Sequence, residues 1–208
     1  MKSPTQHTSR VINLGSVLLL AVFIFISCSS QTAQRAGQGA AGGAVVGAVG
    51  GMVSALVFGG DVADAAARGA VWGGATGATA GAMSGAVADS NQKKAQQAAE
   101  LEALKKEIGD DAFNGLAALV DCKHEVAQGY GRTAAGSSNA NYSLAGLWLQ
   151  VLAYKDAGQN DQAQALLPDI VAKDDKYSSE SQVETTAQNA MQKLGDIRQE
   201  YKLPRKCS

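Results

Sequence analysis

Three cysteines and two histidines are the residues of this chain that can supply a thiolate or an imidazole. Cys28 follows residues 11–27, which carry no charge, while Cys122 and His124 lie two positions apart and Cys207 is the penultimate residue. A thiol can be joined to lipid, oxidised to a disulfide or bound to a metal, and each outcome requires different neighbours. The surroundings of each cysteine therefore indicate its chemistry.

Cys28 has the surroundings of a lipid-modified cysteine. Lys2 and Arg10 are the only charges ahead of the run VINLGSVLLLAVFIFIS, which is the layout of a signal peptide. The segment FISCSS resembles a lipobox, although Phe25 replaces the usual leucine. We expect residues 1–27 to be removed and Cys28 to carry diacylglycerol and an N-acyl chain such as palmitate, with no other cofactor. The alternatives are ordinary cleavage nearby and an uncleaved anchor.

With Cys28 committed to lipid, Cys122 and Cys207 remain as a pair in an oxidising compartment, and we expect them to form a disulfide. His124 stands near Cys122 and Asp121, but tetrahedral zinc needs four ligands and no others accompany them in the sequence. We therefore predict no metal site and interpret His124 as a core or helix-surface residue. Two independent thiols are the alternative to the disulfide.

No other side chains form a catalytic pattern. Acidic residues from Glu100 to Glu107 alternate with Lys105 and Lys106, as on a solvated helix face. The glycine repeats lie in apolar sequence rather than between a strand and a helix, so they do not indicate a phosphate site. The net charge of −1 lacks the basic excess of a nucleic-acid binder. We predict a protein without catalytic residues and without a nucleic-acid partner.

Most of the 24 glycines lie between Gly37 and Gly85, many of them at four-residue intervals. Each glycine inside a helix costs about 1 kcal/mol relative to alanine, so the regular spacing must serve close contact between helix backbones. We predict a glycine-zipper helical hairpin over residues 39–88, turning near residues 59–68. The expected contact residues are Gly39, Gly43, Gly47, Gly51, Gly69, Gly73, Gly77, Gly81 and Gly85.

We expect this hairpin to cross or enter a membrane, because each arm is long enough for a hydrocarbon layer of about 30 Å. Residues 28–38 then form a lipidated linker. Three alternatives stay open: a Gly/Ala linker, a soluble hairpin packed on itself, and a segment that only dips into lipid.

FISCSS followed by two GxxxG ladders resembles the glycine-zipper outer-membrane lipoproteins, the group that includes the rickettsial-type surface antigen and SlyB-like proteins. The resemblance covers roughly residues 20–90. It implies self-association in the outer membrane, support of envelope structure and no enzymatic activity. Ser29 after the cysteine agrees with sorting to the outer membrane as in enteric-type bacteria. The long C-terminal region departs from this group.

Residues 91–208 are charged and amphipathic, and we expect a small antiparallel helical bundle in the periplasm. One helix should cover QKKAQQAAELEALKKEIG, and a second should begin at Asp110 or Asp111 and include His124. A third should start at an Asn141 cap and end at Gly158, a fourth should span about 160–172, and the last about 179–201. The fold class is therefore all-α: a glycine-zipper transmembrane hairpin followed by this bundle.

The stretch LAYKDAGQNDQAQALL resembles the turn of a tetratricopeptide repeat, in which Tyr154 packs the first helix, Gly158 makes the turn and Ala163 permits close approach of the second helix. This resemblance implies a groove for a peptide or a partner. An ordinary antiparallel helix pair is the alternative.

Three functions follow from these expectations. The first is a non-enzymatic envelope lipoprotein that self-associates through its zipper faces. The second is an adaptor whose residues 91–208 bind a protein of an envelope or secretion machine. The third is a pore, which the absence of polar stripes in either arm disfavours.

Overall fold

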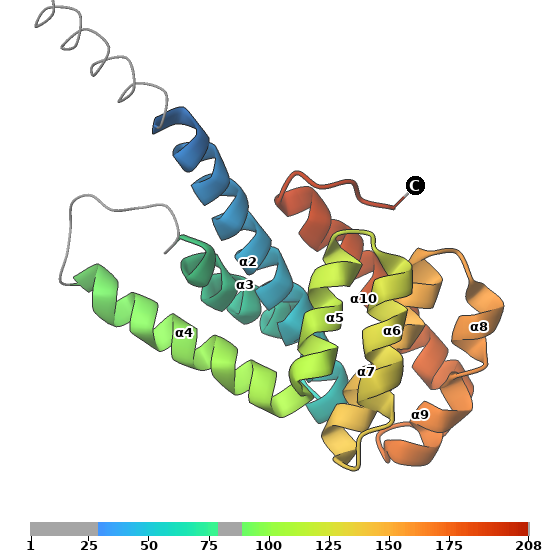
Figure 1. Ribbon diagram of the computed structural model, residues 1–208. Helices are drawn as coiled ribbons and strands as arrows, with labels where there is room; N and C mark the ends of the chain where they lie inside the picture. The colour runs from blue at the N-terminus through green and yellow to red at the C-terminus, as the bar shows by residue number, and fades with distance from the viewer. Residues whose placement is uncertain (1–28, 79–88, 208) are drawn as a thin grey trace, which may run out of the picture.

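The computed structural model describes residues 29–78 and 89–207, and within these ranges every regular element is helical, which confirms the all-α prediction (Figure 1). Residues 1–28, Gly81 and Gly85 lie outside this part of the chain. The helices are α2 (Ser29–Phe58), α3 (Val62–Ala78), α4 (Asp89–Ile108), α5 (Asp110–Val120), α6 (His124–Ala135), α7 (Ala140–Asp156), α8 (Asn160–Gln164), α9 (Leu167–Lys173) and α10 (Glu180–Glu200).

Helices α2 and α3 form a hairpin, but the turn is shorter than the predicted residues 59–68, because α3 already begins at Val62. Gly59 and Gly60 turn the chain with φ of +85° and +124°, which glycine adopts readily. The Asp61 carboxylate then accepts a hydrogen bond of 2.8 Å from the backbone N–H of Asp64 and so caps the start of α3. Residues 29–38 are helical as part of α2, where a linker was expected.

The hairpin and the C-terminal helices share one core. Gly50 lies directly against Leu104 of α4 and Leu116 of α5. Lys176 donates a 2.5 Å hydrogen bond to the Val57 carbonyl near the end of α2, where a cation is favourable. The change of composition near residue 90 therefore does not separate two cores. The α2 residues in the common core include Val45, Val49, Met52, Val53 and Leu56.

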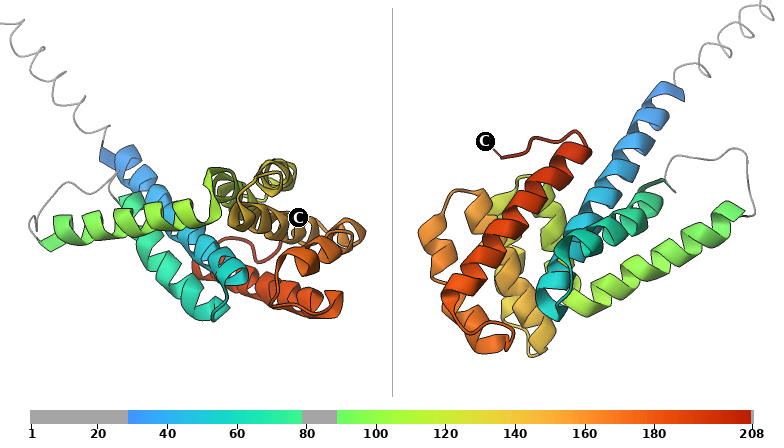
Figure 2. Two further views of the ribbon diagram at one scale, coloured as in Figure 1. Left: turned by 90° about the horizontal axis from the view of Figure 1, so that it is seen from below. Right: turned by 180° about the vertical axis from the view of Figure 1, so that it is seen from behind.

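The first turns of α2 project away from the bundle, and α2, α3 and α4 each contact the other two (Figures 1 and 2). Among the described helices, none is both long enough and apolar enough to cross a bilayer.

The second predicted helix is divided into α5 and α6. Cys122 has a φ of +59°, a left-handed conformation that ends a helix, and the N–H of Lys123 bonds back to the Ala118 carbonyl at 2.8 Å. The prediction of one helix that includes His124 was wrong, because a cysteine in this conformation leaves no sequence signal comparable to glycine.

The third helix begins earlier than predicted. Asn139, rather than Asn141, is the cap, and its side-chain oxygen accepts hydrogen bonds from the N–H groups of Asn141 and Tyr142. Helix α7 ends just before Gly158, which has the expected left-handed φ of +72°.

The fourth predicted helix is also divided, into α8 and α9. Pro168 stands in the first turn of α9. Proline has no N–H for a preceding helical turn and clashes with it, so the proline suits a helix start. The second helix of a tetratricopeptide repeat would continue unbroken through residues 165–166, whereas here the helix is interrupted between α8 and α9.

Candidate functional site

The glycines of the hairpin allow α2 and α3 to touch through their backbones. A Cβ atom added to Gly69 would overlap the carbonyl oxygen of Gly47, and one added to Gly51 would overlap the carbonyl oxygen of Ala65. These neighbours are backbone atoms, so only movement of a whole helix could relieve the overlap. Gly39 and Gly43 lie within α2, and Gly73 and Gly77 lie within α3.

We expect Gly69→Ala to lower the free energy of unfolding by about 1–3 kcal/mol, because the added methyl group has no space against the Gly47 backbone. Gly129→Ala in α6 is the matched control, since its Cβ would meet only the Arg132 guanidinium at 4.0 Å. The control should be neutral or more stable by up to about 1 kcal/mol. Equal unfolding midpoints of the two variants in a denaturant titration would contradict a backbone contact at Gly69.

A second glycine contact joins α6 and α7, and the sequence analysis missed it. A Cβ at Gly146 would lie 2.6 Å from the Gly131 carbonyl oxygen, and one at Gly131 would lie 3.0 Å from the Gly146 carbonyl oxygen. Gly146 stands in the apolar run SLAGLWLQ, in the middle of a helix, which is the available signal for a close approach.

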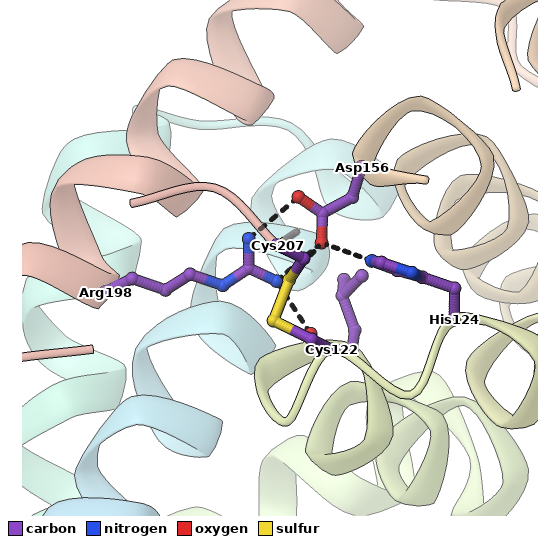
Figure 3. The surroundings of a disulfide bond; sticks show 6 residues. Cys122, His124, Asp156, Arg198 and Cys207 are labelled. Atoms are coloured by element: carbon purple, nitrogen blue, oxygen red, sulfur yellow. Dashed lines mark hydrogen bonds and ion pairs between the residues drawn. A yellow bond between two sulfur atoms is a disulfide. The ribbon is translucent and has the colours of Figure 1, made fainter. Parts of the chain in front are cut away.

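Cys122 and Cys207 are joined by a disulfide, with Cα atoms 5.6 Å apart, as the sequence led us to expect (Figure 3). Cys122 lies in the turn between α5 and α6, and Cys207 lies in the tail after α10. The bond connects elements that are 85 residues apart. It belongs to a group of five residues, which we call the Asp156 cluster: Cys122, His124, Asp156, Arg198 and Cys207.

Asp156 is the centre of this cluster. Its carboxylate accepts hydrogen bonds from both terminal nitrogens of Arg198, at 2.8 and 2.6 Å, and its Oδ2 lies 3.0 Å from His124 Nε2. The Asp156 and Arg198 side chains are only 4% and 1% exposed. Arg198 also donates to the Leu119 carbonyl at 2.7 Å. The Asp156 carboxylate lies at the C-terminal end of α7, where the negative end of the helix dipole repels it. The buried Arg198 guanidinium therefore supplies the counter-charge that this carboxylate needs.

His124 is near Cys122 in the sequence, but the parts played by Asp156 and Arg198 were not predicted. Asp121, the acidic residue beside Cys122 in the sequence, is exposed and pairs with Lys123 at 2.9 Å instead. Arg198 has a sequence signal, because it lies four residues after Leu194, on the apolar stripe of α10. A charge in such a stripe requires a buried partner of opposite sign.

A polar groove of about 630 Å³ lies between α10 and the α7–α8 turn, lined by Lys155, Asn160, Gln164, Glu184, Gln188, Met191 and Gln192. Lys155 and Glu184 form an ion pair of 2.6 Å along it. Burial acts to raise the pKa of Glu184, but hydrogen bonds from Lys155 and Gln188 and the charge of Lys155 outweigh it, so the pKa is lowered overall.

The turn beside this groove contains the three residues of the tetratricopeptide-like prediction, which the structure places as follows. Tyr154 packs against the common core, Gly158 makes the turn, and Ala163 is fully buried. A second hollow of about 440 Å³ adjoins the Asp156 cluster and is lined by His124, Asp156, Lys206 and Cys207 among others. The two hollows share Lys155 and Met191, so they lie side by side.

Residues 10–92 match the YMGG-like Gly-zipper family model. This Gly-zipper segment includes α2, α3 and the start of α4, and it supports the interpretation of the glycine ladders. The match is consistent with a membrane-associated envelope protein. No curated protein and no solved structure matches the chain. The helices beyond the Gly-zipper segment therefore have to be interpreted from their own geometry.

Proposed function

We propose that this chain is a non-enzymatic envelope lipoprotein, anchored in the outer membrane by acyl chains on Cys28 and by its Gly-zipper segment, with the C-terminal helices in the periplasm. The principal support is α2, which is helical from the first described residue, Ser29, and continues without a break into the common core. The anchor is then coupled to the helical bundle through one rigid element. The hairpin need not span the membrane for this coupling.

Mass spectrometry of the mature N-terminus tests the anchor. We expect the first residue to be a triacylated Cys28, with residues 1–27 absent. A Cys28→Ser variant should accumulate with its full N-terminal segment, because the peptidase that cuts lipoproteins acts only on the lipid-modified cysteine. An unmodified Cys28 in the wild-type protein, whether cleaved or not, would contradict the proposal.

Self-association is the second part of the proposed function. The described contacts between α2 and α3 use Gly47, Gly51 and Gly69, and the ladder of the second arm continues beyond them with Gly73, Gly77, Gly81 and Gly85. A stripe without side chains also suits contact between copies of the chain. The proposed product is an oligomer that supports envelope structure.

Replacement of Gly73, Gly77 and Gly81 by leucine should dissociate this oligomer in mild detergent, as measured by sedimentation. Ala63→Leu with Ala67→Leu is the control, because both alanines are exposed on α3 and the same side chain is added. Persistence of the oligomer in the triple glycine variant would remove the zipper from the assembly.

An adaptor is the second candidate function, and the polar groove beside the α7–α8 turn is the observation that favours it. Because α2 completes the core of the C-terminal helices, the full chain should be used rather than residues 91–208. A photo-crosslinking residue at Gln188, in the groove, should capture one defined envelope protein, while the same residue at exposed Thr185 should not. Equal capture at both positions would count against the groove.

A further inference from the structure

The Asp156 cluster brings together metal-ligand atoms from three separate parts of the fold. The side-chain donor atoms of His124, Asp156 and Cys207 all lie within 4.8 Å of one another. Cys122 adds a fourth donor, since its sulfur is bonded to that of Cys207. The sequence analysis predicted no metal because the ligands near Cys122 numbered too few, and the fold supplies the others from α7 and from the tail.

Contacts other than the disulfide hold these donors in place. In the tail, the Leu203 N–H donates to the Arg198 carbonyl at 2.8 Å, and Arg205 pairs with Asp196 at 2.7 Å. The backbone bond from Lys123 to Ala118 fixes the turn at Cys122. We therefore expect both cysteines to stay close to His124 and Asp156 when the sulfur–sulfur bond is absent.

We propose that reduction of the Cys122–Cys207 disulfide converts the Asp156 cluster into a zinc site with Cys122, His124, Asp156 and Cys207 as ligands. Two thiolates, one imidazole nitrogen and one carboxylate oxygen form a four-ligand set of the kind that Zn²⁺ prefers, whereas Ca²⁺ and Mg²⁺ prefer oxygen alone. The site then exists only in the reduced protein, because disulfide sulfurs carry no negative charge for the metal.

The redox step requires a dithiol reductant. One thiolate of the reductant attacks a sulfur of the disulfide and forms a mixed disulfide, and its second thiol then releases the protein as a dithiol. The reductant is oxidised to a disulfide, and Cys122 and Cys207 gain two electrons and two protons. Zn²⁺ displaces those two protons, so the dithiol plus Zn²⁺ carries the same net charge as the disulfide.

Asp156 and His124 change partners in the metal form, in which the ion takes the place of the Arg198 bond to Asp156 Oδ2. In the disulfide form Asp156 Oδ2 faces His124 Nε2, which therefore carries the hydrogen of that contact. In the metal form this nitrogen binds Zn²⁺ and the ring hydrogen is on Nδ1. Arg198 still donates to Asp156 Oδ1 and to the Leu119 carbonyl, so it orients the carboxylate toward the ion. The adjoining hollow of about 440 Å³ gives the ion access.

The test uses the full chain in detergent with Cys28→Ser and His7→Gln, which remove the remaining thiol and imidazole. Zn²⁺ is titrated against a chromophoric chelator, with the protein either oxidised or reduced by a phosphine. We expect one Zn²⁺ per reduced chain and none per oxidised chain. Co²⁺ should give thiolate charge-transfer absorption only in the reduced protein. His124→Ala should weaken Zn²⁺ binding at least about 100-fold, because loss of a direct ligand costs more affinity than loss of a residue that only hydrogen-bonds to a ligand.

Asp121→Asn is the control, because this neighbouring carboxylate is exposed and outside the cluster. It should leave Zn²⁺ affinity unchanged. Reduced protein that binds Zn²⁺ no better than oxidised protein would overturn the proposal. Unchanged affinity in His124→Ala, or an equal loss in Asp121→Asn, would also overturn it. Thermal unfolding gives a separate readout: Zn²⁺ should raise the Tm of the reduced protein and leave that of the oxidised protein unchanged.

Discussion

Asp156→Asn should lower the free energy of unfolding by about 3–5 kcal/mol, because it leaves the guanidinium of Arg198 buried without a counter-charge. Arg198 is 1% exposed and donates to both carboxylate oxygens of Asp156, so water cannot replace the lost partner. Asparagine keeps the size of the side chain and one acceptor oxygen. The lower free energy of unfolding therefore results from the missing charge and not from a cavity. Urea unfolding followed by circular dichroism measures it.

Two further variants define this result. Asp156→Asn combined with Arg198→Met should recover most of the lost stability, since a buried pair replaced by apolar groups is often neutral. Asp196→Asn breaks the ion pair between Asp196 and Arg205, whose side chains are 54% and 48% exposed respectively. This variant should change the free energy of unfolding by less than about 1 kcal/mol. If the Asp156 and Asp196 variants lost similar amounts, the buried pair would have no special part in stability.

Cys207→Ser should lower the free energy of unfolding by about 4 kcal/mol, because the disulfide closes a large loop in the unfolded chain. The bond joins residues 85 positions apart and so restricts most of the C-terminal half. The measurement is denaturant unfolding of the full chain in the presence of a chelator, which prevents metal from stabilising the thiols.

Cys28→Ser serves as the control for this prediction. It removes the sulfur of the proposed lipid site, which takes no part in the Cys122–Cys207 bond, and should leave the unfolding midpoint unchanged. Addition of a phosphine reductant to the wild-type protein should reproduce the shift seen with Cys207→Ser. An unfolding midpoint that does not respond to the reductant would show that the bond contributes nothing to stability.

The sequence predicted helices well where one local signal dominated. Apolar periodicity located α10, and the left-handed preference of glycine located the end of α7 at Gly158. Helix breaks with weaker signals were missed, namely the turn at Cys122 and the interruption before Pro168. A cysteine in a left-handed conformation looks like any other helix residue in a sequence.

Long-range partners were the other limit of prediction. The glycine ladder indicates that a backbone must approach closely, but the same pattern suits a second arm, another copy or a lipid-embedded partner. The structure shows Gly47 and Gly69 in contact within one chain, and Gly50 against the C-terminal helices. The partnership of Asp156 with Arg198 joins residues 42 positions apart, and nothing local in the sequence pairs them.

Helix α2 has 30 residues and so measures about 45 Å at 1.5 Å per residue. Its later turns pack in the common core, while its first turns project away from the bundle (Figure 2). Because a helix is stiff along its length, a sideways force on the first turns of α2 exerts torque on the packing around Met52 and Leu56. A tilt of α2 imposed from outside would therefore strain the core packing of Leu104 and Leu116 against Gly50.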